Sequence, residues 1–176
     1  RMHRNLLAGG ETAVALDETV IYATDKGIRK KRKELEIIRN EKLPAVFDLI
    51  GEAAALGDLS ENAEFTSAIE ERENLNRRAI LIKDQLDRVN RIQPDEAKTD
   101  HVTLGSRVTL TNLSNQDQEA YSILGPWDGD VDKGIISYLS PMGRALIDKI
   151  PGEEFEIELP GGKAHYKLEK IQIHRD

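Results

Sequence analysis

Apolar residues recur at helical spacing over the first half of the chain. In one run the gaps alternate between three and four residues: Phe65, Ala68, Arg72, Leu75, Ala79, Ile82, Leu86 and Val89. This is the a/d spacing of a coiled coil, with Arg72 as its polar exception, and it predicts one helix over about residues 60–92. An earlier helical run follows a Thr24-Asp25 cap signal and continues through Leu56. Pro44 predicts a kink or short break in that run near residues 40–43.

The two helical runs are separated only by the short connection from Leu56 to Ser60. So short a connection makes consecutive helices antiparallel neighbours. Folding there mostly places apolar positions opposite apolar positions: Leu35 with Ile82, Ile38 with Ala79, Lys42 with Leu75, Leu49 with Ala68, and Ala53 near Phe65. We therefore predict a long antiparallel helical hairpin, a coiled coil, over residues 21–93. Residues 1–20 lack a sustained period and are expected to form a loosely held, disordered arm.

Beyond the hairpin the apolar period becomes two. Residues 94–101 are polar and contain Pro94, a composition typical of a linker. The following pattern predicts strands at residues 108–113, 120–124 and 134–139, a short helix after Ser140-Pro141, and a hairpin that turns at Pro160-Gly161-Gly162. Residues 102–176 are thus expected to form a small α+β domain, and the fold class of the whole chain is α+β.

Composition narrows the class of function. Cysteine is absent from the 176 residues, which excludes disulfides, thiolate zinc sites and cysteine nucleophiles. The net charge of -7 is unlike that of an autonomous nucleic-acid-binding protein, which is usually basic. No apolar run approaches the ~20 residues that span a bilayer. We expect a cytoplasmic protein without a membrane partner.

Two carboxylates at the predicted hairpin tip are the candidate chemistry. Asp58 and Glu61 are three residues apart at the end of a long arm. A capping box explains them without any function, with Asp58 as N-cap and Glu61 as the N3 residue after Gly57 has ended the preceding helix. Alternatively, the two acids share a hard cation such as Mg²⁺, whose remaining oxygen ligands come from a partner or from substrate phosphates. The periodicity alone leaves both interpretations open.

The residues around these acids form a specific motif. Gly57-Asp58-Leu59-Ser60-Glu61-Asn62-Ala63-Glu64-Phe65 strongly resembles the tip motif of the bacterial Gre transcript cleavage factors, closer to the GreA type. The resemblance continues through Ser140-Pro141-Met142-Gly143-Arg144 to the Pro160-Gly161-Gly162 turn and covers about residues 20–174. Together these matches outweigh the capping box, although Asp58 can both cap a helix and function.

The resemblance implies a transcription elongation factor. Its hairpin, with the acidic tip at residues 57–62, would enter the secondary channel of RNA polymerase, and an FKBP-like C-terminal domain would dock near the channel entrance. Such factors rescue backtracked complexes by stimulating the polymerase's own cleavage of the extruded RNA 3′ segment, and are not enzymes themselves. Asp58 and Glu61 would then be the catalytic and metal residues, positioning a Mg²⁺ held jointly with the polymerase and its attacking water.

The same resemblance suggests roles for other residues. The expected tip-shaping residues are Gly57, Ser60, Asn62 and Phe65; the candidates for RNA contact are Arg72 and Arg78; the candidates for polymerase docking are Ser140, Pro141, Met142 and Arg144. Structural alternatives remain: Arg72 as the polar member of the seam, Arg78 as a surface ion pair with Glu36 or Glu41, and the 140–144 segment as a capped helix that covers a sheet. RNA polymerase and the nascent RNA 3′ end are the expected partners, and a monomer is expected in solution.

Two positions depart from the family pattern. Phe65 stands where the family often has Tyr, and Ile69 stands where it commonly has Lys or Arg near the extruded RNA. The Ile69 departure leaves open a same-fold inhibitory or regulatory paralogue that binds the channel without stimulating cleavage. A prolyl isomerase or chaperone activity is suggested only by the expected C-terminal fold, and the 5% aromatic content argues against it.

Overall fold

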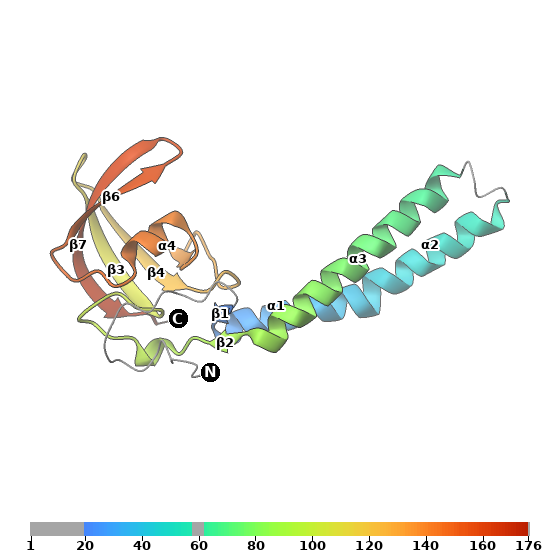
Figure 1. The fold of residues 1–176 in the computed structure, drawn as a ribbon, viewed down its shortest axis with the longest axis horizontal. Helices are drawn as coiled ribbons and strands as arrows, with labels where there is room; N and C mark the ends of the chain where they lie inside the picture. Colours follow the sequence, from blue (N-terminus) through green and yellow to red (C-terminus); the bar gives the residue numbers. More distant parts are fainter. Residues whose placement is uncertain (1–19, 58–61, 176) are drawn as a thin grey trace. The chain divides into compact units, whose positions relative to one another are not determined.

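The computed structural model describes residues 20–57 and 62–175, which fall into two compact units (Figure 1). One unit is the helical hairpin, Ile28–Arg88; the other combines the residues up to Gly27 with those from Val89 onward. The helical segments of the hairpin are α1 (Asp25–Ile37), the π-helical η1 (Ile38–Lys42), α2 (Leu43–Ala55) and α3 (Ala63–Arg88). The predicted arm lies almost wholly outside the described residues, and so do Asp58, Ser60 and Glu61.

The first helical run starts at the predicted cap, and its break, at Ile38–Lys42, overlaps the predicted range of residues 40–43. Thr24 Oγ1 accepts a hydrogen bond from the amide of Gly27 at 3.2 Å, which is an N-cap interaction. The α-helical pattern is interrupted by η1 just before Pro44, which occupies the first turn of α2. Proline has no amide hydrogen and its ring crowds the carbonyl four residues earlier, so a regular α-helix cannot pass through this position unchanged.

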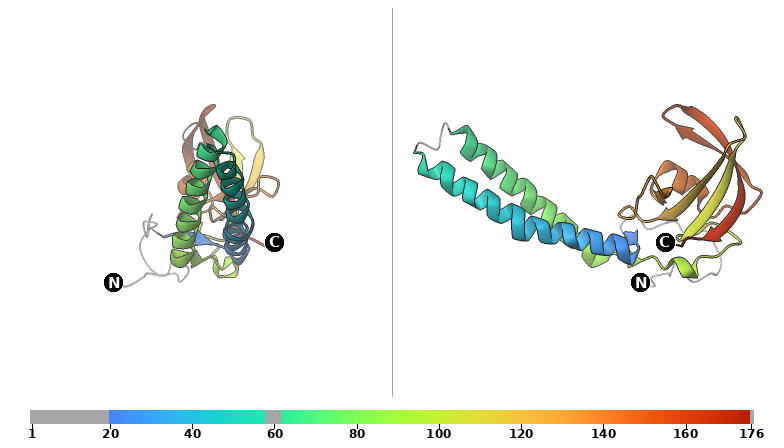
Figure 2. Two further views of the ribbon diagram at one scale, coloured as in Figure 1. Left: turned by 90° about the vertical axis from the view of Figure 1, so that its right-hand side faces the viewer. Right: turned by 180° about the vertical axis from the view of Figure 1, so that it is seen from behind.

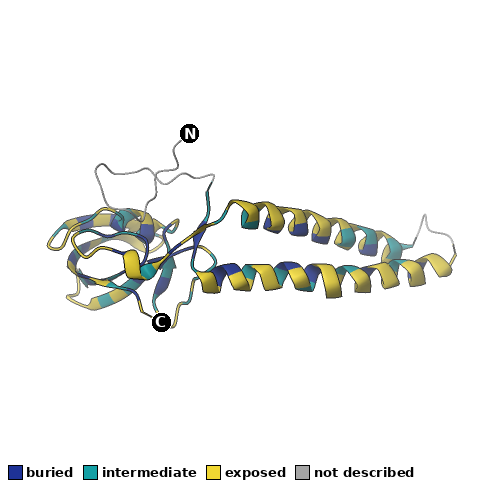
Figure 3. Cartoon of the chain, turned by 90° about the horizontal axis from the view of Figure 1, so that it is seen from below, coloured by how far each residue is buried: buried dark blue, intermediate teal, exposed yellow. Residues whose placement is uncertain are grey.

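Apolar side chains bury the seam of the hairpin. Its hydrophobic cluster consists of Leu35, Ile38, Val46, Leu75, Ala79 and Ile82, with Ile82 completely buried. Figure 3 shows buried positions, in dark blue, on the facing sides of the helices and exposed positions on their outer sides. The predicted helical hairpin is therefore confirmed. Leu49, expected to face Ala68, is instead 54% exposed, and Val46 and Ala53 are the buried residues of α2.

The second unit is built on a curved sheet. Its elements are β1 (Tyr22–Ala23), β2 (Asn90–Arg91), the 3-10 turn η2 (Pro94–Glu96), β3 (Ser106–Asn112), β4 (Gln118–Leu124), β5 (Ile135–Ser137), α4 (Pro141–Leu146), β6 (Glu154–Leu159) and β7 (Gly162–Ile173). Five strands pair in the order β5-β4-β3-β7-β6, antiparallel except for the parallel pair β4–β5. In Figure 2 the sheet curls around α4. The predicted α+β class is confirmed.

Alternation of side chains explains the core of this sheet. Val108 and Leu110 on β3 are completely buried, while Thr109 between them is half-buried, because successive residues of a strand point to opposite faces. Leu168 from β7 and Leu146 from α4 are also completely buried and belong to the same cluster. The unit therefore has one continuous apolar core.

The predicted hairpin was too long at its C-terminal end, because α3 ends at Arg88 and not near residue 92. Strand β2 pairs in parallel with β1, and Ile92 beside it is only 2% exposed in the core of the sheet unit. In the segment expected to be a linker, Ala97 is also buried. These apolar residues are isolated from one another in the sequence, so they give no periodic signal, and a polar composition hides their burial. Within residues 20–57 and 62–175, no helix has the length and apolar character needed to cross a membrane.

Candidate functional site

The described ends of the tip are the last turn of α2 and the first turn of α3. Helix α2 ends at Ala55 with Leu56 as its C-cap, and Gly57 follows with a φ of 113°. A positive φ is costly for residues with a Cβ, which explains glycine at this place in the motif. The two expected catalytic residues, Asp58 and Glu61, lie between these ends in the sequence and outside the described residues. The same holds for Ser60, an expected tip-shaping residue.

Asn62 is the N-cap of α3. Its Oδ1 accepts hydrogen bonds from the backbone amides of Glu64 and Phe65, both at 3.1 Å. These amides belong to the first turn of α3, where no earlier helical carbonyl is available to them. Because Asn62 caps the helix that begins at Ala63, the capping box with Asp58 as N-cap and Glu61 at N3 does not describe the start of α3.

Asn62 also reaches back to the preceding helix. Its Nδ2 donates a hydrogen bond of 3.0 Å to the carbonyl oxygen of Ala53, in the last turn of α2. The sequence predicted a tip-shaping role for Asn62, and it offered Asp58 as N-cap only in the capping-box alternative. The available signal was an Asn directly before Ala63 and Glu64, which is a favourable cap followed by good helix-forming residues.

A groove lies along the distal part of the hairpin, between α2 and α3. It has a volume of about 780 Å³ and is lined by apolar and small residues and by three glutamates: Val46, Leu49, Glu52, Ala53, Leu56, Ala63, Glu64, Ser67, Ala68 and Glu71. The hydrophobic cluster of the seam includes neither Ala53 nor Ala68, although both are buried. Small side chains therefore leave the two helices less tightly packed near the tip than further down the hairpin.

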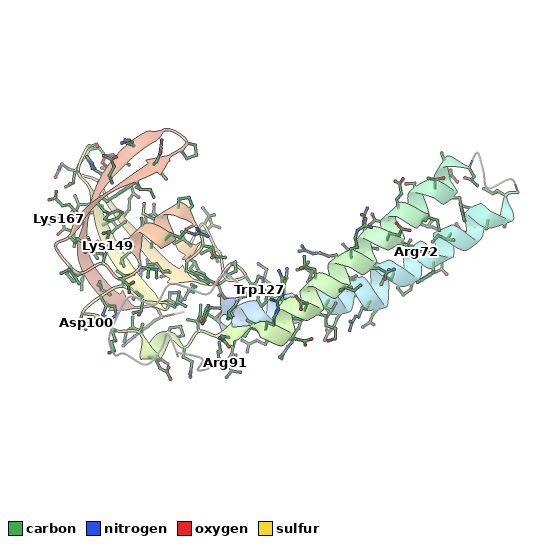
Figure 4. All side chains as sticks on the ribbon, in the orientation of Figure 1. Arg72, Arg91, Asp100, Trp127, Lys149 and Lys167 are labelled. Atoms are coloured by element: carbon green, nitrogen blue, oxygen red, sulfur yellow. The ribbon has the colours of Figure 1, made fainter. Side chains whose placement is uncertain are left out.

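The two candidate RNA-contacting arginines have different surroundings. Arg72 is half-buried on α3, the position expected for a polar member of the seam (Figure 4). Arg78 donates two hydrogen bonds to one carboxylate oxygen of Glu34, with its Nε at 2.9 Å and its Nη2 at 2.7 Å from Oε1. The structural alternative for Arg78 named Glu36 or Glu41, but the observed partner across the hairpin is Glu34.

Glu34 is held in its charged form. Partial burial acts to raise the pKa of Glu34, but hydrogen bonds and the charges of Lys31 and Arg78 outweigh that effect and keep this pKa below its ordinary value. The Lys31 ammonium lies 2.8 Å from the same carboxyl group. An Arg78 that contacts RNA would have to leave this arrangement.

Charge is unevenly distributed along the hairpin. Residues 43–75 contain eight acidic side chains and one basic side chain, Arg72. Residues 25–42 and 76–88 together contain twelve basic and six acidic side chains. The tip half of the hairpin therefore repels RNA phosphates, and a cation between carboxylate and phosphate would reverse that repulsion.

Helix α4 carries the candidate docking residues. Ser140 is its N-cap: the hydroxyl accepts from the amide of Gly143 at 3.0 Å and donates to the carbonyl of Ser137 at 2.6 Å. Pro141 fills the first helical position and is exposed, and Met142 packs against the core. Arg144 donates from Nε to the carbonyl of Leu139 at 3.1 Å, and its side chain is exposed. The predicted capped helix is confirmed; Pro141 and Arg144 are its accessible members.

A complete cation site is absent from the described residues. Residues 20–57 and 62–175 contain no group of three or more His, Cys, Asp or Glu side chains able to hold a metal ion. Mg²⁺ takes close to six oxygen ligands and keeps several waters. Asp58 and Glu61, the ligands predicted from the sequence, lie outside the described residues.

Comparison with known proteins places this chain in a family. Residues 21–90 match the family described as "Transcription elongation factor, N-terminal", and residues 96–173 match "Transcription elongation factor, GreA/GreB, C-term". The "Transcription elongation factor GreA" of Nautilia profundicola is 40% identical over 148 residues, which cover 84% of this chain and 91% of that protein. The chain belongs to the GreA/GreB family. It is of the GreA type and is a transcription elongation factor.

A second curated relative supports this membership. The protein of the same name from Prosthecochloris aestuarii is 36% identical, with 87% of this chain and 97% of that protein covered. Among solved structures, GreA factor homolog 1 (Gfh1) of Thermus thermophilus is 23% identical with a TM-score of 0.40, covering 86% of this chain and 98% of that chain.

Proposed function

We propose that this elongation factor acts on RNA polymerase by inserting its hairpin into the secondary channel and stimulating the polymerase's own cleavage of backtracked RNA. The observation that carries the proposal is the intact pair Asp58 and Glu61 within the Gre-type tip motif, Gly57 to Phe65. Membership of the GreA/GreB family supports RNA polymerase as the partner.

The proposed chemistry is hydrolysis of a phosphodiester with two metal ions, one of them held jointly. When bound, Mg²⁺ would stabilise charge on the phosphate and lower the pKa of its water. Asp58 and Glu61 would supply two carboxylate ligands, and the polymerase and the RNA phosphate would complete the site. The acidic character of residues 43–75 supports a site that the polymerase and the RNA complete, since these residues repel RNA phosphates by themselves.

The protein would not be an enzyme in isolation. Its candidate acids belong to the tip motif of a slender hairpin, and the groove between α2 and α3 is lined in part by Glu52, Glu64 and Glu71, which disfavour an RNA phosphate there. The substrate would therefore be held by the polymerase, with the nascent RNA 3′ end presented to the tip. Without polymerase, we expect no RNA cleavage above background.

A second candidate function keeps the channel binding without the cleavage. Ile69 favours it, because an apolar, half-buried side chain stands where Gre factors commonly have Lys or Arg. The engagement of Arg78 with Glu34 points in the same direction, since it removes a second candidate for RNA contact. In that case the protein would be an inhibitory or regulatory paralogue.

A backtracked elongation complex with labelled RNA separates the two functions. The complex is incubated with Mg²⁺ and the wild-type protein, Asp58→Asn or Glu61→Gln, and binding to polymerase is measured in parallel. We expect the wild type to release a short 3′ fragment and each variant to lower the cleavage rate by about 10²-fold or more with retained binding. EDTA should abolish cleavage. Binding of the wild type without release of a fragment would exclude the first function and favour the paralogue.

A further inference from the structure

The Asn62 side chain is hydrogen-bonded to both helices that hold the acidic loop. Its Nδ2 donates to the carbonyl of Ala53 in the last turn of α2 at 3.0 Å, and its Oδ1 accepts from two amides in the first turn of α3 at 3.1 Å. Residues 58–61, which include Asp58 and Glu61, connect these two turns. One side-chain amide therefore connects the last turn of α2 to the first turn of α3, the two turns that flank residues 58–61 in the sequence.

The chemistry of this contact requires a side-chain amide. The backbone amides of Glu64 and Phe65 need an acceptor, and the carbonyl of Ala53 needs a donor. An aspartate at this position can accept from the amides but cannot donate to the carbonyl. A serine can cap the helix, but its single short hydroxyl cannot replace an amide with separate donor and acceptor atoms. The partners also fix which atom of Asn62 is oxygen and which is nitrogen.

Packing near the tip gives this hydrogen bond its importance. The hydrophobic cluster of the seam extends toward the tip only as far as Val46 and Leu75, with Ile50 partly buried against it. Beyond it, Ala53 and Ala68 are buried, Phe65 and Ile69 are half-buried, and Leu56 is 74% exposed. The hydrophobic cluster thus stops short of the ends of α2 and α3, where the Asn62–Ala53 bond supplies a directional connection between them.

We propose that Asn62 is a positioning residue for the cleavage reaction: it fixes the spacing between the end of α2 and the start of α3, and thereby the placement of Asp58 and Glu61. This inference rests on the proposed function of the acids. The cap stabilises the first turn of α3, and the Nδ2 bond fixes the distance between that turn and the last turn of α2. A displacement of about 1 Å at reacting groups lowers rates by about 10²-fold, so a change in this spacing has a measurable effect on catalysis.

Two substitutions separate the positioning role from the cap. Asn62→Asp and Asn62→Ser both preserve a favourable N-cap residue and remove the Nδ2 donor, and one is charged while the other is neutral. Thr66→Ala is the matched control, because the Thr66 hydroxyl donates to the backbone carbonyl of Asn62 at 3.3 Å and plays no part in the amide contact. Asp58→Asn serves as the reference for loss of an acid.

The readouts are polymerase binding, the cleavage rate at saturating protein and its Mg²⁺ dependence. We expect both Asn62 variants to bind polymerase within about twofold of the wild type and to keep its helical circular dichroism. Their cleavage rates should fall about tenfold, and the Mg²⁺ concentration for half-maximal rate should rise, because misplaced carboxylates would bind the shared ion less tightly. High Mg²⁺ should partly restore the rate, which it would not do for a binding defect. Thr66→Ala should behave as the wild type.

Three outcomes would overturn the inference. The first is wild-type cleavage and Mg²⁺ dependence in both Asn62 variants while Asp58→Asn is inactive; that result leaves the proposed function intact. The second is a loss of cleavage that matches a loss of binding, which reduces Asn62 to a stabilising residue. The third is full cleavage with Asp58→Asn and Glu61→Gln, which removes the proposed function and with it the groups that Asn62 would position.

Discussion

Several polar side chains in this protein form hydrogen bonds with backbone groups at helix starts. Thr24, Asn62 and Ser140 each cap the helix that follows them. Asp128 extends the first of these caps: its carboxylate accepts from the amide and the hydroxyl of Thr24 and from the amide of Gly125. Such contacts satisfy amides that a helix or turn leaves without partners. A residue of a sequence motif can therefore stabilise the fold whether or not it also contacts a partner.

Gly143 provides a test of how tightly α4 is seated. A Cβ at this position would lie 2.2 Å from the carbonyl oxygen of Ser137, and a backbone atom cannot move away cheaply. We expect Gly143→Ala to lower the free energy of unfolding by about 3 kcal/mol, the upper end for overpacking. Gly161→Ala is the control, because no atom lies within 4 Å of its Cβ. Equal stability of the two variants in urea titrations would contradict this description of α4.

At the scale of the elements, the hairpin is held by an apolar seam and by ion pairs on its surface. The seam lies mainly between α1, η1 and α2 on one side and α3 on the other. Helix α2 also contains Gly51, whose Cβ would meet nothing within 4 Å and whose φ is not positive. Gly51→Ala should therefore stabilise the hairpin by about 1 kcal/mol, the usual difference in helix propensity, as measured by thermal unfolding followed by circular dichroism.

The Glu34–Arg78 pair predicts a pH dependence of the hairpin. Because the pKa of Glu34 is lower in the folded protein than in the unfolded chain, the pair stabilises the hairpin above the ordinary pKa of a glutamate. That contribution is lost as the pH falls through the lowered value. For a partly exposed pair we expect it to be about 0.5–1 kcal/mol.

The measurement compares the wild type with Glu34→Gln at pH 7 and near pH 3. The variant should be less stable at neutral pH, and the difference should disappear in acid. A difference that persists unchanged at low pH would show that Glu34 acts through packing and not through its charge.

At the scale of the molecule, the chain has two units with separate cores. The hairpin cluster and the cluster around the sheet have no residue in common. The sheet unit includes residues from both ends of the described chain, since β1 pairs with β2 and Tyr22 packs edge-on against Tyr138 at 5.9 Å between ring centroids. Each unit thus has its own hydrophobic cluster, and the chain passes between the units twice.

Separate cores predict separate responses to core substitutions. Ile82→Ala in the hairpin and Leu110→Ala in the sheet each remove a completely buried side chain, and each should cost its own unit about 3 kcal/mol. Hydrogen exchange should become faster in α1–α3 for the first variant and in β3–β7 for the second, with the other unit unchanged. Loss of protection in both units from either substitution would mean that the two cores unfold as one.

Sequence by itself determined the elements and the family. The heptad spacing from Phe65 to Val89, the break before Pro44 and the alternation on β3 are local patterns that each impose a periodicity on buried positions, and the tip motif identified the Gre family. Tertiary structure decided which residues far apart in the sequence become buried together or form contacts. The burial of Ile92 and Ala97, the pairing of Arg78 with Glu34 and the bridge from Asn62 to Ala53 all join residues whose spacing carries no period. They depend on the path of the chain in space, which sequence patterns over short windows do not encode.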